Sequence, residues 1–283
     1  MIAFLNGTFL PEAEAVVPLS DRGFLLGDGL FETIRVAGGN PFRFAQHMER
    51  LAAGADFLKI KLPFTPVELQ KFAGKIIEMN QLPESVLRLT LTRGSGVRGY
   101  STRSADQPTL AMTLHLLPSS SAVPPLQWSL ITSSFRIPAG DVLAAFKSTS
   151  KVLNVLARAE AEAGGADEAL ILNTNGEVVE TAGGNIFWVS DGQVCTVPTS
   201  RGALPGVTRA VVLDMCKNLG LKTKESVAMP EQLLQAEGVV VTQTVLGIIP
   251  VMAINHLPIG SSPLVEQLVR AYSGILRGVS GGF

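Results

Sequence analysis

Cysteine and histidine are both scarce in this chain of 283 residues, and their spacing excludes several kinds of site. The two cysteines, Cys195 and Cys216, form no CxxC pair, so we expect free buried thiols and a reducing compartment. The three histidines, His47, His115 and His256, lie in unrelated contexts and form no HExxH motif. The sequence therefore predicts neither a disulfide framework nor a metal site.

An excess of charge of one sign is also lacking. The formal net charge is −1 and the isoelectric point is about 6.3, which gives no overall basic field for nucleic acid or an anionic membrane. The opening run MIAFLNGTFLPEAEAVV contains neither a basic leader nor a long apolar stretch, so we expect no signal peptide and no membrane span. These absences predict a cytoplasmic enzyme with no nucleic-acid or membrane partner.

The apolar content of the chain is sufficient for two domains. Hydrophobic residues make up 46% of the sequence, and a chain of this length can form two cores. The segment 117–126, LPSSSAVPPL, interrupts two strand-like runs with proline and serine and is the best candidate boundary. We expect a smaller N-terminal domain over residues 1–117, a linker over 118–126 and a larger C-terminal domain over 127–283.

Short strands and helices alternate without the βαβ rhythm of a Rossmann domain, which predicts a mixed α/β (α+β) fold. Residues 44–58 place apolar side chains at helical spacing, and Thr65 and Glu68 form a capping box around a proline at the first helical position. The other expected elements are helices near 151–163, 207–219 and 263–277, and strands at 86–93, 109–116, 128–135, 168–173, 177–181, 186–189, 194–197 and 238–242.

Residues 146–188 carry the strongest chemical signal. Two lysines, Lys147 and Lys151, precede Glu180, which ends the strand-like run GEVVE. A lysine amine can hold an aldehyde cofactor covalently, and a carboxylate can keep a pyridine nitrogen protonated so that the ring accepts electrons. Since Glu180 comes from a strand end, its side chain is expected to have a fixed position.

This stretch resembles the core of the class IV, fold-type IV enzymes that use pyridoxal 5′-phosphate (PLP). The family includes branched-chain aminotransferases, D-amino-acid aminotransferases, (R)-selective amine transaminases and aminodeoxychorismate lyase. The resemblance covers nearly the whole chain and implies PLP as cofactor, a small N-terminal α/β sandwich and a larger C-terminal α/β domain. It also implies a homodimer, in which the GDGLFETIR turn or the RGSGVRGY loop reaches toward the cofactor of a neighbouring subunit.

Spacing to Glu180 separates the two lysines. Glu180 follows Lys147 by 33 residues and Lys151 by 29, and the resemblance favours the longer interval. Lys151 also opens a helical pattern, where a solvated lysine of the first turn would be ordinary. Lys147 is therefore the expected catalytic lysine and Glu180 the expected partner of the pyridine nitrogen, although Ser150 stands where the family often has asparagine.

The resemblance implies three sets of donors for the cofactor phosphate. Arg50, in HMERL, lies one position off the apolar seam of its helix and matches the arginine with which the family binds the phosphate. Val207 and Thr208 follow the proline and glycine of ALPGVTRA, where the first amides of a helix can face an anion. Thr244 follows a strand and resembles the third phosphate-contacting turn. The alternatives are a surface arginine, an ordinary helix start and a plain strand-end threonine.

Substrate contacts are expected from two segments. Arg98, in RGSGVRGYST, falls where D-amino-acid aminotransferases place an arginine for the substrate carboxylate, and the same segment closely resembles one in aminodeoxychorismate lyase. Tyr100 stands where the D-specific enzymes usually have histidine, and Phe31, in GDGLFETIR, replaces their tyrosine. These departures argue against strict D-amino-acid activity, and the residues after Lys147 lack the GGNY pattern of branched-chain enzymes.

Three functional hypotheses follow. A transaminase would transfer an amino group between an amino acid or primary amine and a keto acid, with Lys147 forming the internal aldimine and moving the proton through a quinonoid intermediate. An aminodeoxychorismate lyase would use the same residues to release pyruvate and p-aminobenzoate. A non-catalytic binding protein would be expected to lack Lys147 or Glu180, and both are present. The lyase-like signal is confined mainly to residues 93–102, which favours the transaminase.

Overall fold

The computed structural model describes residues 1–117 and 126–280, and the chain divides into two compact units. The first unit contains Met1–Pro118, Phe146–Ser150 and Leu276–Phe283, and the second contains Ser119–Ala145 and Lys151–Ile275. Most of the expected linker, residues 118–125, lies outside the described residues. The segment that carries Lys147 thus belongs to the unit built mainly from the N-terminal part of the chain.

The first unit contains an antiparallel sheet with the strand order β2-β1-β6-β5-β3-β4. Its strands are β1 (Ile2–Leu5), β2 (Thr8–Pro11), β3 (Gly29–Ala37), β4 (Asn40–Pro41), β5 (Ser85–Thr92) and β6 (Thr109–Leu116). Side chains alternate between the two faces of a strand, so the buried Leu87, Leu89 and Leu91 of β5 share one face while Arg88 and Thr90 lie on the other.

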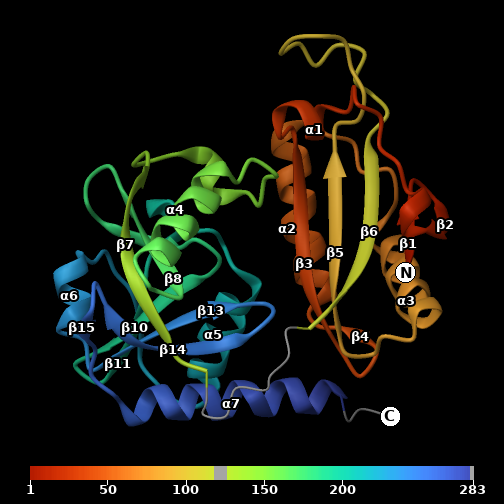
Figure 1. The fold of residues 1–283 in the computed structure, drawn as a ribbon. Coiled ribbons are helices and arrows are strands. Elements are labelled where there is room, and N and C mark those ends of the chain that lie inside the picture. The colour runs from red at the N-terminus through yellow and green to blue at the C-terminus, as the bar shows by residue number, and fades with distance from the viewer. Residues whose placement is uncertain (118–125, 281–283) are drawn as a thin grey trace. The chain divides into compact units, whose positions relative to one another are not determined.

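Helices α2 (Phe44–Leu58) and α3 (Pro66–Asn80) pack on the leucine face of this sheet (Figure 1). The apolar spacing of α2 buries Phe44, Met48 and Leu51 in the core of the first unit, as its sequence predicts. At the start of α3, the capping box is also confirmed, because Thr65 N donates to Glu68 Oε2 at 2.8 Å and Glu68 N to Thr65 Oγ1 at 3.3 Å. Short helices η1 (Glu12–Glu14) and α1 (Arg22–Leu26) precede β3.

The second unit contains a mixed sheet with the order β12-β11-β10-β13-β14-β7-β8-β9, and β15 pairs with β14. Three of its pairings, β7 with β8, β7 with β14 and β11 with β12, are parallel. Its strands are β7 (Trp128–Ile137), β8 (Glu168–Asn173), β9 (Val178–Thr181), β10 (Asn185–Ser190), β11 (Gln193–Thr196), β12 (Thr223–Glu225), β13 (Gly238–Gln243), β14 (Gly247–Ile254) and β15 (Leu257–Pro258).

Helix α4 (Val152–Ala163) connects the parallel strands β7 and β8 and packs against both. The other helices of this part of the chain are η2 (Val142–Ala145), η3 (Thr199–Arg201), α5 (Val207–Asn218), α6 (Pro230–Leu234) and α7 (Pro263–Ser280). Across residues 1–117 and 126–280, no helix has both the length and the apolar character required to cross a membrane.

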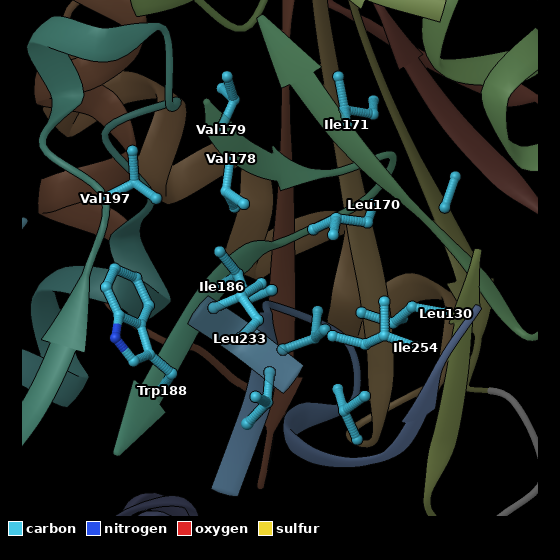
Figure 2. Packing of buried hydrophobic residues seen from close by; sticks show 14 of the residues in the cluster. Leu130, Leu170, Ile171, Val178, Val179, Ile186, Trp188, Val197, Leu233 and Ile254 are labelled. Atoms are coloured by element: carbon cyan, nitrogen blue, oxygen red, sulfur yellow. The ribbon is translucent and has the colours of Figure 1, made fainter. Parts of the chain in front are cut away.

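The core of the second unit fixes the strand ends that matter for function. Figure 2 shows Val178, Val179 and Ile186 packed with Leu170 and other apolar side chains of the sheet. All four side chains are at most 1% exposed. Glu180 directly follows Val179 on β9, and Asn185 directly precedes Ile186 on β10, so both polar residues extend from tightly packed backbone.

The mixed α/β fold expected from the sequence is confirmed, and each expected strand and helix is present with its ends shifted by a few residues at most. One expectation is wrong: the GDGLFETIR segment is not a turn but forms most of β3, which pairs with β5 from Gly29 to Val36. The sequence does not reveal this strand, because both of its faces are largely buried and the alternation of apolar and polar residues is absent.

Candidate active site

The segment Phe146–Ser150 lies along the start of β3 in the first unit. Phe31 N donates to Lys147 O and Thr149 N donates to Gly29 O, both at 2.9 Å. These bonds bring the Lys147 side chain to the ring of Phe31, with Nζ 4.5 Å from the ring centroid. Two residues that the sequence assigned separately, as catalytic lysine and as substrate contact, are therefore neighbours.

Arg88, which sequence reasoning missed, reaches the same ring from β5. Its guanidinium carbon lies 3.5 Å from the Phe31 centroid, the geometry of a close cation–π contact. Burial lowers the pKa of Arg88 to about 10, so the side chain is still cationic at neutral pH. Since arginine is unusual in the middle of an inner strand, its place in VLRLTLT was an available signal. Two basic side chains on one aromatic ring make this face of the sheet suited to an anionic group.

On the helix side of the sheet, Glu32 joins β3 to α2. Its carboxylate accepts Arg50 Nε at 2.9 Å, Arg50 Nη2 at 2.6 Å and His47 Nδ1 at 2.7 Å. Burial opposes ionisation of Glu32, but the hydrogen bonds and charges of Arg50 and His47 outweigh it and lower the pKa of the carboxyl group. The pKa of His47 is lowered chiefly by burial, so this histidine is neutral at neutral pH.

The loop that carries Arg98 and Tyr100 is held at its base by a buried arginine. Arg22 donates Nε to Asp28 at 2.8 Å, and its Nη1 donates to the carbonyls of Gly99 and Ser101 at 3.0 Å. Arg98 and Tyr100 themselves are exposed, the tyrosine to 87%. The structure therefore places these two predicted substrate contacts on the surface of the first unit, while Phe31 lies beside Lys147.

A second arginine strengthens the base of this loop. Arg93 binds both oxygens of Asp28, through Nε at 2.8 Å and Nη2 at 3.0 Å. Burial acts against the ionised form of Asp28, but bonds and charges from Arg93 and Arg22 lower the pKa of its carboxyl group. The anion that fixes the loop thus stays charged at neutral pH.

In the second unit, Glu180 is held by the chain that leads into α5. Its Oε2 accepts Leu204 N at 2.9 Å and Asn185 Nδ2 at 3.4 Å. Asn185 Nδ2 also donates to Leu204 O at 2.9 Å. The sequence gives no sign of the role of Leu204, because a backbone amide leaves no trace in the side-chain pattern.

Helix α5 begins at Val207 after the N-cap residue Gly206. Its first turn contains Thr208, and the N–H groups of such a turn have no partner within the helix. Glycine has no side chain with which to cap them, so the start of α5 can face an anion. Thr244 lies in the turn between β13 and β14 and therefore follows a strand, as expected.

Lys151 occupies the N-cap position of α4, and its carbonyl accepts Val155 N at 3.0 Å. The helix start that its sequence context predicts is confirmed. Lys151 belongs to the second unit and Lys147 to the first.

Comparison with known proteins identifies the family. The model of the class IV aminotransferases matches residues 29–254. A relative from Methanocaldococcus jannaschii, provisionally named a branched-chain-amino-acid aminotransferase, is 33% identical over 94% of this chain and 92% of its own. A D-alanine aminotransferase of Bacillus licheniformis is 30% identical over 96% and 95% of the two chains. The aminodeoxychorismate lyase of Bacillus subtilis is also 30% identical, over 91% and 88%.

A solved structure extends the likeness to the fold. The branched-chain amino acid aminotransferase of T.th. with pyridoxamine 5′-phosphate superposes with a TM-score of 0.92, at 29% identity, over 98% of this chain and 94% of that one. The protein belongs to the class IV aminotransferases. It is an enzyme of this PLP-dependent class, for which amino acids and keto acids are the expected substrates.

The residues present fit PLP. The first unit offers an amine, Lys147, on a defined backbone segment, and the second offers Glu180 oriented by two N–H donors. The glycine-capped start of α5 suits a phosphate group. The chemistry of this donor set, an amine, a carboxylate and anion-binding amides, matches the aldehyde, ring nitrogen and phosphate of the cofactor.

Proposed function

We propose that this chain is a transaminase that transfers an amino group between an amino acid or primary amine and a keto acid. The observation that carries the proposal is the grouping of Lys147 Nζ and the Arg88 guanidinium on the ring of Phe31, at 4.5 and 3.5 Å from its centroid. A lysine that can bind the cofactor thus stands near a cation that can attract the carboxylate of an amino or keto acid.

Each remaining residue has an assigned role in this proposal. PLP supplies an aldehyde that a lysine can bind and a ring that accepts electrons from the reacting carbon. Lys147 holds the aldehyde carbon, and Glu180 pairs with the pyridine nitrogen. Arg50 and the amides of Val207 and Thr208 bind the phosphate, together with Thr244 in the β13–β14 turn.

Lys147 also moves the proton in the proposed reaction. With PLP bound, Lys147 Nζ would take the proton from the substrate carbon and deliver it to the cofactor carbon to which Nζ had been attached.

Arg98 and Tyr100 are proposed to contact substrate in a homodimer. Arg98 lines a groove of about 360 Å³ together with Arg22, Leu25 and Leu26, and Tyr100 follows the lining residues 96–99 in the chain. Apolar side chains of α1 are exposed around it, Phe24 to 71% and Leu25 to 58%. Such exposure is uncommon on a monomer surface and supports a second copy of the chain as the partner. If light scattering at the assay concentration shows that the fully active enzyme is a monomer, the proposed contribution of a second subunit is wrong.

A second candidate function is aminodeoxychorismate lyase. It is favoured by the likeness of RGSGVRGYST to that enzyme and by the 30% identity to the Bacillus subtilis lyase. The lyase would use Lys147 and Glu180 in the same places but eliminate pyruvate instead of exchanging an amino group.

Product analysis separates the two functions. The purified enzyme is incubated with L-amino acids, D-amino acids, (R)- and (S)-amines or aminodeoxychorismate, each with and without 2-oxoglutarate or pyruvate. We expect turnover to require the keto acid. Efficient formation of p-aminobenzoate without any acceptor would replace the transaminase with the lyase and leave the roles of Lys147, Glu180 and Arg50 unchanged.

A further inference from the structure

One amide side chain in the second unit, that of Asn185, joins Glu180 on β9 to Leu204 in the chain before α5. Asn185 Nδ2 donates to Leu204 O at 2.9 Å and to Glu180 Oε2 at 3.4 Å, while Leu204 N donates to the same Glu180 oxygen at 2.9 Å. The three residues form a closed ring of hydrogen bonds. Asn185 therefore acts on Glu180 twice, once directly and once by fixing the peptide of Leu204.

Packing leaves this amide little freedom to move. Asn185 is only 6% exposed, and Ile186 beside it is buried in the core of the second unit (Figure 2). On its other side lies Gly206, the N-cap of α5, where a Cβ atom would come within 2.0 Å of Asn185 Oδ1. Glycine at this position is thus required for the close approach of the amide to the start of α5.

The number of hydrogen-bond donors and acceptors explains why asparagine suits position 185. The Nδ2 group has two N–H donors, and the ring supplies two acceptors for them, a carbonyl and a carboxylate. Aspartate has the same shape, but in its ionised form it donates to neither acceptor and places a second negative charge 3.4 Å from Glu180. Both bonds therefore depend on the amide.

We propose that Asn185 is a positioning residue that orients the Glu180 carboxylate and ties it to the chain entering α5. The inference rests on the proposed function, in which Glu180 serves the pyridine nitrogen and the start of α5 serves the phosphate. It adds that the orientation of Glu180 is set by one buried amide. Loss of this amide weakens cofactor binding through Glu180, although Asn185 itself carries out no chemistry.

A double-mutant cycle tests the proposal on the full-length protein. The affinity of the apoprotein for PLP is measured by equilibrium dialysis for the wild type, Asn185→Ala, Glu180→Gln and the double variant. We expect Asn185→Ala to weaken PLP binding about tenfold in the wild-type background, which is about 1.4 kcal/mol, and less than about twofold in the Glu180→Gln background. An equal loss in both backgrounds, or no loss in the wild type, would overturn the proposal.

Two further variants exclude a general packing effect. Asn185→Asp keeps the volume beside Gly206 but loses the donors, so we expect it to lose at least as much PLP affinity as Asn185→Ala; wild-type affinity would overturn the proposal. Asn154→Ala is the matched control, because Asn154 Nδ2 also donates to a backbone carbonyl, that of Ala182, at 2.9 Å. It should retain wild-type affinity, and a loss equal to that of Asn185→Ala would count against a specific role for Asn185.

The same cycle distinguishes this inference from the proposed function on which it rests. If Glu180→Gln alone leaves both PLP affinity and the absorbance spectrum of the bound cofactor unchanged, the assignment of Glu180 to the pyridine nitrogen is wrong, and this inference is lost with it. If Glu180→Gln weakens binding but Asn185→Ala acts independently of it, only the positioning role of Asn185 is lost.

Discussion

Arg50 donates two hydrogen bonds to Glu32, from Nε to Oε1 at 2.9 Å and from Nη2 to Oε2 at 2.6 Å. The pair joins helix α2 to strand β3, and the carboxylate is only 1% exposed. His47 on the same helix donates from Nδ1 to the same carboxylate at 2.7 Å. A planar guanidinium bound in this way has a single orientation.

Replacement of Arg50 by alanine is expected to weaken cofactor binding, and it also leaves the buried Glu32 carboxylate without its arginine. The loss of one charge-assisted contact with a phosphate costs about 1.5–3 kcal/mol, or roughly ten- to a hundredfold in PLP affinity. Equilibrium dialysis of PLP with the apoprotein measures the change. Arg43→Ala, at the exposed N-cap of the same helix, is the control and should bind PLP normally. If Arg50→Ala binds PLP with wild-type affinity, Arg50 does not bind the phosphate and its role is purely structural.

Replacement of Glu32 by alanine is expected to lower the free energy of unfolding by about 3–5 kcal/mol, because it leaves a mostly buried arginine without its carboxylate. Urea denaturation followed by circular dichroism gives this value. Glu84→Ala serves for comparison, since Glu84 pairs with Arg35 at 3.0 Å but is 49% exposed. That variant should lose no more than about 1 kcal/mol. Equal losses in the two variants would mean that burial does not strengthen the Glu32 pair.

His47 is expected to make stability depend on pH. Burial lowers its pKa below the ordinary 6.5, so below pH 6.5 the unfolded chain binds a proton that the folded chain does not. The stabilisation is complete above pH 6.5 and is lost as the pH falls through the folded pKa. Urea unfolding between pH 7.5 and 5 should therefore give a steeper decline for the wild type than for His47→Asn. If the free energy of unfolding declines equally with falling pH in both proteins, groups other than His47, such as Glu32, cause the loss of stability in acid.

Lys147 is expected to carry the cofactor. Reduction of the purified, yellow enzyme with borohydride should leave the pyridoxyl mass on the peptide that contains Lys147, as read by mass spectrometry. Lys147→Ala should lose activity, whereas Lys151→Ala should keep it, because Lys151 is the first flanking residue of α4 in the second unit. A label on Lys151, with Lys147→Ala still active, would reverse the assignment while leaving the family unchanged.

Arg98 is expected to act on the substrate carboxylate. Arg98→Ala should raise the KM for amino or keto acids by roughly tenfold or more, since a paired charge is lost, and should affect a carboxylate-free amine such as 1-phenylethylamine much less. Arg103→Ala, an exposed arginine of the same loop, is the control. If Arg98→Ala changes the KM for both kinds of substrate equally, the substitution has altered the loop itself. If only Arg88→Ala raises the KM for amino or keto acids, Arg88 on β5 binds the substrate carboxylate instead.

Local sequence patterns predicted the elements but not all of their partners. The spacing of Phe44, Met48 and Leu51 defined α2, and Thr65 and Glu68 defined the start of α3, because helical periodicity and capping involve residues within a few positions of one another. The segment 29–37 was not recognised as a strand, since burial on both faces removes the alternation that marks a half-exposed strand.

The sequence alone determined the chemical inventory of this enzyme: a lysine 33 residues before a glutamate, an arginine beside the apolar seam of a helix, and a glycine before a helix. Only the tertiary structure decided which groups act on one another. Arg88 reaches the ring beside Lys147 because β3 and β5 pair in one register, and Asn185 reaches Leu204 because the chain before α5 folds back to β10. Such contacts depend on strand register and chain crossovers, which are set by packing over the whole domain and leave no periodic signal in the sequence.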